Sequence, residues 1–306
     1  MPPHIESGLT SVVIVTADSG AIVRGCVQCV LASTAPCEIV LVDNASRDGH
    51  VDALLLELAQ EPRLRAVHST VNHGFGPACN RGAAIARGDA LLFLNPDCLI
   101  ADDTIARLRE LAQRHMHAGV IGVRVEAADG TPERAARRRD PTLRRALMTL
   151  TGLARFESRR PGLAGIEMPP SSMPAGFEAE AVEAVSGACL YLPRDAFDAI
   201  EGFDEGYFLH CEDLDLCRRV RDAGRSVLFA ADIRVRHEQG SSSKHRSSFV
   251  ERHKHRGMWR YFTKFDPAAR NPLWRGLVWL GIWTHYHALA LIRSRHNRQS
   301  HVERAT

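Results

Sequence analysis

The chain has 306 residues, of which 45% are hydrophobic and 25% are charged, and its formal net charge is +3. The length allows one large domain or two small ones with a sizeable core, and the composition is that of an ordinary globular protein. So small a net charge excludes a strong partner preference based on the total alone.

Apolar runs typical of buried strands alternate with helical patterns over the first 125 residues. Strands are expected at 11–16, 38–43, 64–68, 90–95 and 120–125, and helices at 21–33, 51–59, 76–87 and 102–115. This alternation predicts a parallel sheet with helices on both faces, in which ligands bind at the carboxyl ends of the strands. Three of the expected strand ends carry polar residues, namely Asp18, Asp43, and Asn95 with Asp97.

The alternation ends after residue 127. A helix is one interpretation of the basic stretch 134–153, and the four prolines and three glycines of 161–176 predict a mobile loop. Regular structure is expected again as strands at 182–192, 226–229 and 233–237 and helices at 194–200 and 211–223, with Gly224 as the stop signal of the last helix.

The segment 273–292 is apolar and rich in tryptophan, and its length of about 20 residues could span a bilayer. Arg275, His285 and His287 interrupt it and basic clusters flank it, so an amphipathic helix lying in the membrane interface is favoured. A transmembrane helix and a helix buried in a soluble core or dimer interface remain alternatives.

Basic residues cluster at 134–145, 252–260 and 293–298. Such clusters suit phosphate, anionic lipid or nucleic acid, and a solvated loop is the alternative for the first of them. Nucleic acid is the least favoured partner, because 134–145 lacks interleaved aromatic residues. The eight scattered cysteines favour a reduced, cytosolic environment, and residues 1–10 lack the apolar segment of a signal peptide.

Three motifs give weak chemical signals when each is taken alone. Asp97, in Asn95-Pro96-Asp97, could ligate a divalent ion, but the tripeptide is also a good turn. The loop 72–76 opens a helix whose amides, with Arg81, could face a phosphate, and His237 could be a metal ligand or a surface residue. The loop lacks the spacing of a P-loop or a dinucleotide-binding motif, which argues against an ATPase or a nicotinamide enzyme.

A fourth stretch, FLHCEDLDLCRRV at 208–220, is rich in acids. Its Glu212, Asp213 and Asp215 could belong to a metal site, supply a general base or form the charged face of a helix.

The order of all these segments resembles the family-2 glycosyltransferases of the GT-A fold. The segments that carry the resemblance over residues 11–243 are VVIVT, VDNASRDG, NHGFGPACNRGAA, LFLNPDC, VSGACLYLPRDAF, GFDEGYFLHCEDLDLCRRVRDAGRSVLF and VRH. Within this family, the chain looks most like the rhamnosyltransferase branch that builds bacterial surface polysaccharides.

The resemblance implies an α/β fold of the GT-A type, with a mostly parallel central sheet flanked by helices and a helical C-terminal tail. The implied glycosyltransferase domain covers residues 1–245, with a donor half at about 1–127 and an acceptor half at about 128–245. Residues 246–306 would form a basic, amphipathic helical extension.

The resemblance also implies which residues bind the nucleotide-sugar donor. Asp43 matches the acid that contacts the nucleotide base, and Thr16, Ala17 and Asp18 match the loop around the nucleotide. The family commonly has Tyr-Asn where this chain has Ala17-Asp18, so the usual aromatic support of the base is missing. Further donor-binding residues are expected to be Asn72, Gly74, Arg81, Asn95 and Gly187, although tight strand packing would equally explain the glycine at 187.

Asn95-Pro96-Asp97 matches the DxD-type motif of the family, with asparagine in place of the first acid. Asp97 and His237 would then hold the divalent cation, Mg²⁺ or Mn²⁺. Asp213 matches the catalytic base, while Glu212 would orient the acceptor or act in its place. The remaining residues of the acidic stretch are expected to be structural: Asp215 paired with Arg218 or Arg219, and His210, Cys211 and Cys217 in packing.

The implied activity is metal-dependent and inverting transfer of a sugar from a nucleotide diphosphate. The suggested donor is dTDP-L-rhamnose, and the suggested acceptor is a glycan or a polyprenyl-diphosphate-linked sugar. The protein would lie in the cytoplasm, peripherally on the inner face of the membrane. The alternative is a non-catalytic nucleotide-sugar-binding or scaffold protein of a polysaccharide assembly complex.

Overall fold

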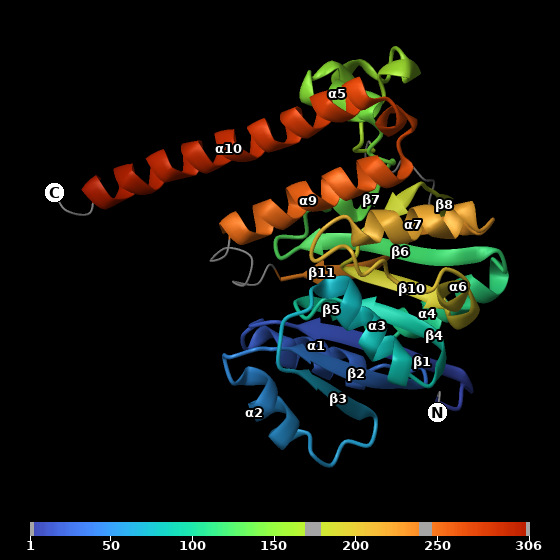
Figure 1. Cartoon of the computed structure of the whole chain (residues 1–306). Helices are drawn as coiled ribbons and strands as arrows, with labels where there is room; N and C mark the ends of the chain where they lie inside the picture. The colour runs from blue at the N-terminus through green and yellow to red at the C-terminus, as the bar shows by residue number, and fades with distance from the viewer. Residues whose placement is uncertain (1–2, 169–178, 239–246, 304–306) are drawn as a thin grey trace.

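The computed structural model describes residues 3–168, 179–238 and 247–303 (Figure 1). Among these residues, nine strands form one sheet in the order β3-β2-β1-β4-β10-β6-β11-β5, and β8 pairs with β11. The strands are β1 (Glu6–Thr16), β2 (Cys37–Asn44), β3 (Leu64–Ser69), β4 (Gly88–Leu94), β5 (Cys98–Ile100), β6 (Ala118–Ala127), β8 (Glu180–Ala181), β10 (Cys189–Pro193) and β11 (Ser226–His237).

The sheet is mixed but mostly parallel. Strands β3, β2, β1 and β4 pair in parallel, as do β6 and β11, while β10 runs antiparallel between β4 and β6. The flanking helices are α1 (Ile22–Leu31), α2 (His50–Glu57), α3 (Phe75–Ile85), α4 (Thr104–Arg114), α6 (Arg194–Ala199) and α7 (Glu212–Asp222). The fold class expected from the sequence is therefore confirmed.

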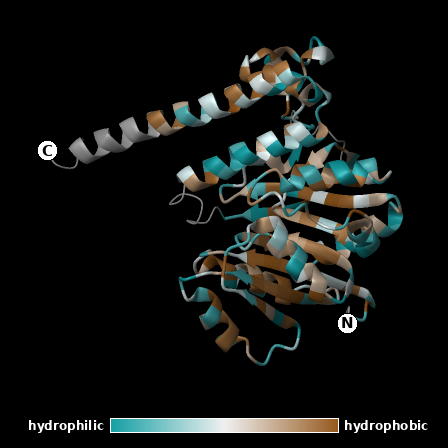
Figure 2. Cartoon of the chain, in the orientation of Figure 1, coloured by the Kyte–Doolittle hydropathy of each residue, from teal (hydrophilic) through white to brown (hydrophobic). Residues whose placement is uncertain are grey.

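The core lies around the central strands. All eight residues of β2 and the last seven of β1 are buried, which explains their continuous apolar sequence: both faces of a parallel strand are covered by helices. Figure 2 shows the same strands as the hydrophobic interior of the body.

In the second half of the chain, the strands begin and end at other residues than the sequence pattern predicts. The expected strand at 182–192 is two strands, β9 (Ala184–Val185) and β10, and the expected pair at 226–237 is the single strand β11. A shift in pairing with β6 between Ala230 and Arg234 produces the irregularity that divided β11 in the sequence pattern. Strand β5 was not predicted, because three residues are too short for a recognisable period.

A single helix over 134–153 is wrong. This stretch forms a 3-10 turn η1 (Arg134–Ala136), β7 (Arg137–Arg138), which pairs with β9, and α5 (Leu143–Leu150). Pro141 disfavours helical geometry in the preceding residue, and Thr142 then caps α5 by accepting a hydrogen bond from the Arg145 amide. The chain continues through the short 3-10 turns η2 (Leu153–Phe156) and η3 (Pro161–Leu163).

The predicted mobile loop at 161–176 lies partly outside the described residues. Its described part contains η3 and a β-bridge between Arg138 and Glu167.

The first basic cluster is largely paired with acids. Its ion pairs are Arg137–Glu180, Arg138–Asp213, Arg139–Glu157 and Arg145–Glu183. These four side chains are at most a quarter exposed, so the solvated-loop interpretation is wrong for them. The side chains of the third cluster, 293–298, are outside the described part of the chain.

Two long helices form the C-terminal region, α9 (Ser247–Phe265) and α10 (Pro272–Glu303), joined by the 3-10 turn η4 (Pro267–Arg270). Asp266, at the end of α9, accepts a hydrogen bond from the Leu143 amide at 2.7 Å, which ties α9 to the start of α5. Helix α10 packs on α9 over its first half, as far as the contact of His285 with His255, and then extends beyond the body (Figure 1).

Burial of 273–292 in the core of this chain is wrong, because Leu273, Leu277 and Leu280 of α10 are 68%, 49% and 57% exposed. Within the described residues, no helix combines the length and hydropathy needed to cross a bilayer. Placement of α10 in a membrane interface or a dimer interface stays a prediction.

Candidate functional site

The ends of β1, β2 and β4 meet at one edge of the sheet. Thr16 lies opposite Asp43 in the β1–β2 pairing, and β4 ends one residue before Asn95. The Asn95 amide donates to the Ala188 carbonyl, which sets the end of β4 against the start of β10. The polar strand ends predicted from the sequence are therefore brought together.

The loops after β1 and β2 are tied to each other. Asp18 has a positive φ of 57°, accepts a hydrogen bond from the Arg47 amide at 2.6 Å and donates its own amide to the Ser46 hydroxyl. Asp43 accepts from the Ser46 amide through one oxygen, and its other oxygen lies 3.4 Å from His68 Nδ1. The half-buried Ala17 lies between Thr16 and Asp18 in this loop.

Asn72 and Gly74 shape the loop before α3. Asn72 Oδ1 accepts from the Asn44 side chain and from the Gly74 amide, at 3.0 and 2.9 Å. Gly74 has φ of 93°, and a Cβ there would lie 2.4 Å from the Phe208 carbonyl oxygen. Any other residue would push away the segment that leads to α7. Farther along α3, Arg81 donates to the Ser69 hydroxyl at 2.9 Å.

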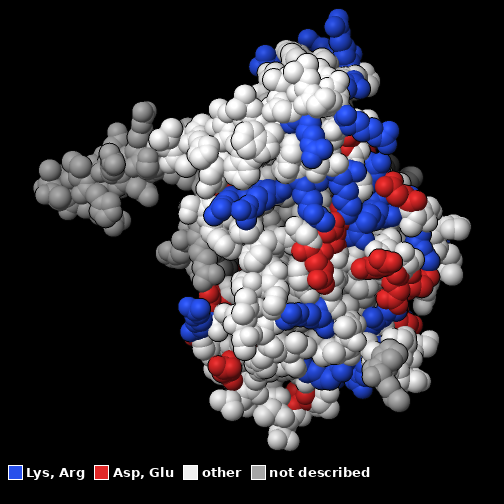
Figure 3. All heavy atoms as spheres, viewed as in Figure 1, with Lys and Arg blue, Asp and Glu red and all other residues white. Residues whose placement is uncertain are grey.

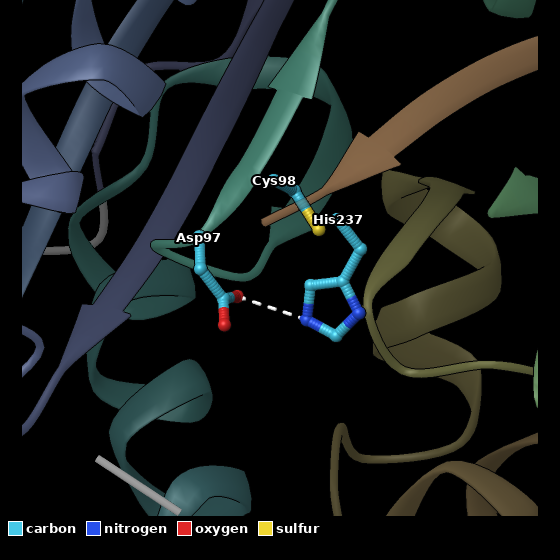
Figure 4. A group of neighbouring side chains, drawn as sticks. All are labelled: Asp97, Cys98 and His237. Atoms are coloured by element: carbon cyan, nitrogen blue, oxygen red, sulfur yellow. Dashed lines mark hydrogen bonds and ion pairs between the residues drawn. The ribbon is translucent and has the colours of Figure 1, made fainter. Parts of the chain in front are cut away.

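Asp97, just before β5, faces His237, the last residue of β11 (Figure 4). Asp97 Oδ1 lies 3.1 Å from His237 Nε2, and the other ring nitrogen, Nδ1, lies 2.8 Å from Glu133 Oε1. The two carboxylates raise the pKa of His237 to about 10, since both favour the charged ring.

The geometry of this pair fits a divalent cation. Neighbouring ligands of an octahedral Mg²⁺, each about 2.1 Å from the metal, are separated by about 3.0 Å, close to the 3.1 Å between Asp97 Oδ1 and His237 Nε2. The Glu133 contact is of the kind that orients a metal-ligating histidine. Cys98 Sγ is also nearby, but burial raises its pKa well above the ordinary range, and a thiol suits neither Mg²⁺ nor Mn²⁺.

Asp213 is held from three sides at the start of α7. Its Oδ2 pairs with the Arg138 guanidinium and accepts from the Gly187 amide at 3.1 Å, while Oδ1 accepts from the Leu214 amide at 2.8 Å. A Cβ on Gly187 would lie 3.3 Å from Asp213 Cβ. The glycine therefore lets β9–β10 approach this acid closely.

Glu212 lies in a different environment from its neighbour. The residue is 7% exposed, and its Oε2 is buried without a hydrogen-bond partner among the described residues. Burial, and then the adjacent charge of Asp213, raise the pKa of Glu212 to about 8. The turn before it is unusual, because His210 and Cys211 both have positive φ.

The other residues of the acidic stretch behave mostly as expected. Asp215 is fully buried and pairs with Arg219, as predicted, and also with Lys264 at 2.6 Å. Cys211 and Cys217 are buried. His210 is exposed, so the packing predicted for it is wrong.

Comparison with known proteins identifies the family. The sequence profile described as glycosyl transferase family 2 matches residues 11–185, more than half of the chain. The chain belongs to glycosyl transferase family 2. It is therefore a glycosyltransferase, which transfers sugar from a nucleotide donor. The observed sheet has the GT-A arrangement expected of this family.

A bacterial rhamnosyltransferase is among the relatives of this glycosyltransferase. The chain is 29% identical over 255 residues to an N-acetylglucosaminyl-diphospho-decaprenol L-rhamnosyltransferase of Mycobacterium tuberculosis, covering 75% of this chain and 79% of the relative.

Solved structures share the fold of the glycosyltransferase. A mannosyltransferase of Pyrobaculum calidifontis, in complex with GDP-Man and Mn²⁺, gives a TM-score of 0.57 at 16% identity, covering 95% of this chain and 77% of its own. GalNAc-T7 with UDP, GalNAc and Mn²⁺ gives 0.59 at 19% identity, covering 76% of this chain, which spans 44% of that protein's chain.

A cavity of about 670 Å³ opens beside the acids of the glycosyltransferase. Its polar end is lined by Asn95, Gly187, Glu212, Asp213 and His237. Thr16, Asp43 and Asp97 are not in its lining.

Two residues of this site were missed by sequence reasoning, Glu133 and Arg138. Glu133 stands alone in a turn, 104 positions before His237, and no pattern singles it out. Arg138 belongs to a basic cluster, which was a signal, but nothing in the sequence shows that it points inward to Asp213.

Proposed function

We propose that this glycosyltransferase moves L-rhamnose from dTDP-L-rhamnose, with inversion, onto a polyprenyl-diphosphate-linked glycan in bacterial surface polysaccharide synthesis. The observation that carries the proposal is one cavity that joins His237, beside Asp97, to Glu212 and Asp213. The sugar and the lipid-linked acceptor are suggested by the name of the mycobacterial relative.

In the proposed donor site, Thr16, Ala17, Asp18 and Asp43 surround the nucleotide at the ends of β1 and β2. Asp43 would accept a hydrogen bond from the base. The glycine loop with Asn72 and Gly74, together with Arg81, Asn95 and Gly187, would complete the surface for the diphosphate and the sugar.

Asp97 and His237 would hold Mg²⁺ or Mn²⁺, with Glu133 orienting the imidazole. The bound cation would supply neutralisation of the charge that grows on the leaving nucleoside diphosphate.

Asp213 is the proposed general base. The acceptor oxygen forms a bond to the anomeric carbon as its proton passes to Asp213, and the bond from that carbon to the diphosphate breaks with its electron pair. A β-linked donor then gives an α-linked product. Arg138 and the Gly187 amide fix the carboxylate, while Glu212 would orient the acceptor.

The proposed location is cytoplasmic, with peripheral contact at the inner face of the membrane. Exposed apolar residues of α10 and the basic residues of α9 support it.

The direct test supplies purified protein with dTDP-L-rhamnose, Mg²⁺ or Mn²⁺ and a polyprenyl-diphosphate-linked N-acetylglucosamine. We expect a product that carries one added rhamnose in the α configuration, seen by mass spectrometry and NMR. A thermal-shift screen of nucleotide sugars identifies the donor independently, because a bound ligand raises the Tm. Stabilisation by another nucleotide sugar alone would show that the donor assignment is wrong.

A non-catalytic binding or scaffold protein is the second candidate, motivated by Ala17, Asp18 and Asn95, which depart from the family pattern. Calorimetry separates the two candidates. A scaffold binds the donor without turning it over with any acceptor, whereas the enzyme consumes it.

A further inference from the structure

Beyond the acids, the cavity has a wall made by three helices. The residues that line it there are Leu143, Ala146, Leu147 and Leu150 of α5, Lys254, Met258 and Phe262 of α9, and Trp274, Leu277, Val278, Gly281, Ile282 and His285 of α10. Most of these side chains are apolar, unlike those at the acid end.

The spacing of these residues shows that whole helix faces line the cavity. On α5 they recur at intervals of three and four, and on α10 the same intervals run from Trp274 to His285. Several remain open to solvent: Leu147 is 43% exposed, Leu150 74%, Trp274 46% and Leu277 49%. An apolar ligand would cover surface that otherwise faces water.

Helix α9 connects this wall to the reaction centre. A Cβ on Gly257 would lie 2.6 Å from the His210 carbonyl oxygen, so α9 touches the turn that leads into Glu212 and Asp213. Lys254 and Met258 flank that contact and line the cavity, and Phe262 follows one turn farther along.

Charge in the lining suits a phosphate beside the acids. Arg138 and the exposed Lys254 both line the cavity. Figure 3 shows Lys and Arg side chains gathered over α9 and the region next to it, beside the largely uncharged surface of α10. A ligand that reaches from the acids to the wall would therefore meet cations and then apolar side chains.

We infer that the groove between α5, α9 and α10 binds the first isoprenoid units of the acceptor's lipid, with Lys254 at its diphosphate. This rests on the proposed function, which places the acceptor sugar at Asp213. A single molecule with a sugar, a diphosphate and an apolar chain matches the order of acids, cations and apolar helix faces. The volume of about 670 Å³ lies within the range of about 300–1,000 Å³ usual for small-molecule sites.

The test uses farnesyl diphosphate as a water-soluble probe of a diphosphate with three isoprenoid units, and isopentenyl diphosphate as the short comparison. Calorimetry on the full chain measures the Kd of each. We expect Leu147→Asp and Leu277→Asp to weaken farnesyl diphosphate at least tenfold and isopentenyl diphosphate less than twofold. Lys254→Gln should weaken both probes.

Leu56→Asp is the matched control, because Leu56 is 80% exposed on α2, outside the cavity lining, and should change neither Kd. Leu147→Met and Leu277→Met should bind like the unmodified protein. Equal affinity of the unmodified protein for the two probes would overturn the inference. So would loss of binding to phosphatidylglycerol vesicles in the aspartate variants with farnesyl diphosphate binding unchanged, since the helices would then face a membrane surface.

Failure of the groove and failure of the proposed function give different results. Sugar transfer to a short-chain acceptor, without any preference for farnesyl diphosphate over isopentenyl diphosphate, would show that only the groove assignment is wrong. Selective farnesyl diphosphate binding without sugar transfer from any nucleotide donor would show that only the proposed function is wrong.

Discussion

The proposed donor half, about residues 1–127, and the rest of the chain build their surfaces in different ways. In the donor half, long buried strands end together, and hydrogen bonds between their loops hold Asp18 and Asp43 in place. In the rest of the chain, two-residue strands, 3-10 turns and helices from distant parts of the sequence surround an open apolar cavity. A nucleotide of fixed shape suits the first surface, and a long lipid-linked chain suits the second.

Replacing Asp213 should separate catalysis from donor binding most sharply. Asp213→Asn is expected to lower kcat by about 10²–10⁴, the usual contribution of a general base, with the donor Kd within twofold of the unmodified protein. Steady-state kinetics and calorimetry measure the two quantities.

The pH profile distinguishes Asp213 from Glu212 as the base. If Asp213 serves, the pH profile of kcat should not follow the titration of Glu212. A rise of about tenfold per pH unit up to pH 8 would instead implicate Glu212, whose pKa is about 8 and is influenced by the neighbouring Asp213 and Arg138.

Glu212 should make the acceptor side less stable in alkali. Its folded pKa of about 8 lies above the ordinary value of 4.5, so the stability gained by holding this proton is complete below about pH 4.5 and lost as the pH rises through 8. Urea unfolding should show that the unmodified protein loses roughly 3–5 kcal/mol between pH 5 and 9 relative to Glu212→Gln. Glu110→Gln, which changes an exposed side chain of α4, is the control. Parallel curves for Glu212→Gln and the unmodified protein would contradict the expectation.

Replacing Glu133 tests how the rest of the chain supports the proposed donor half. Glu133 lies beyond residue 127 and holds His237, the histidine that is proposed to serve the donor. Glu133→Gln is expected to weaken Mn²⁺ binding about 10–100-fold, measured by electron paramagnetic resonance in the absence of any sugar. Glu126→Gln, on the preceding strand β6, is the control. Unchanged Mn²⁺ affinity in Glu133→Gln would show that Glu133 does not support metal binding.

The smallest effect is expected in the donor half alone. Asp43→Ala should raise the Kd of dTDP-L-rhamnose about tenfold, which is the lower end of the range of about 1.5–3 kcal/mol that one hydrogen bond to a charged group contributes. Farnesyl diphosphate binding should not change. Asp52→Ala on α2 should leave both values alone. A parallel loss of both ligands in Asp43→Ala would mean that the two surfaces are not independent.

The same contrast explains what could be predicted from the sequence. Runs such as Val12–Val15 have one physical explanation, burial on both faces of a parallel strand, so the donor half was predicted almost element by element. The pairing of Asp97 with His237 came from resemblance to a family, because 140 positions separate them and no local period connects them.

The rest of the chain resisted prediction because its contacts are tertiary. Pro141 breaks a stretch that otherwise resembles one basic helix, and the inward direction of Arg138 depends on Asp213, 75 positions away. The apolar spacing of α5 and α10 is visible in the sequence, but only the fold brings the two faces to one cavity.

The hydrogen bond from the Leu143 amide to Asp266 has a consequence for synthesis on the ribosome. Its partners are 123 positions apart, so α5 receives this anchor only after α9 has left the exit tunnel. The sheet edge with Asp43 and Asn95 has emerged long before. A nascent chain would thus form the loops after β1 and β2 early and the apolar groove later.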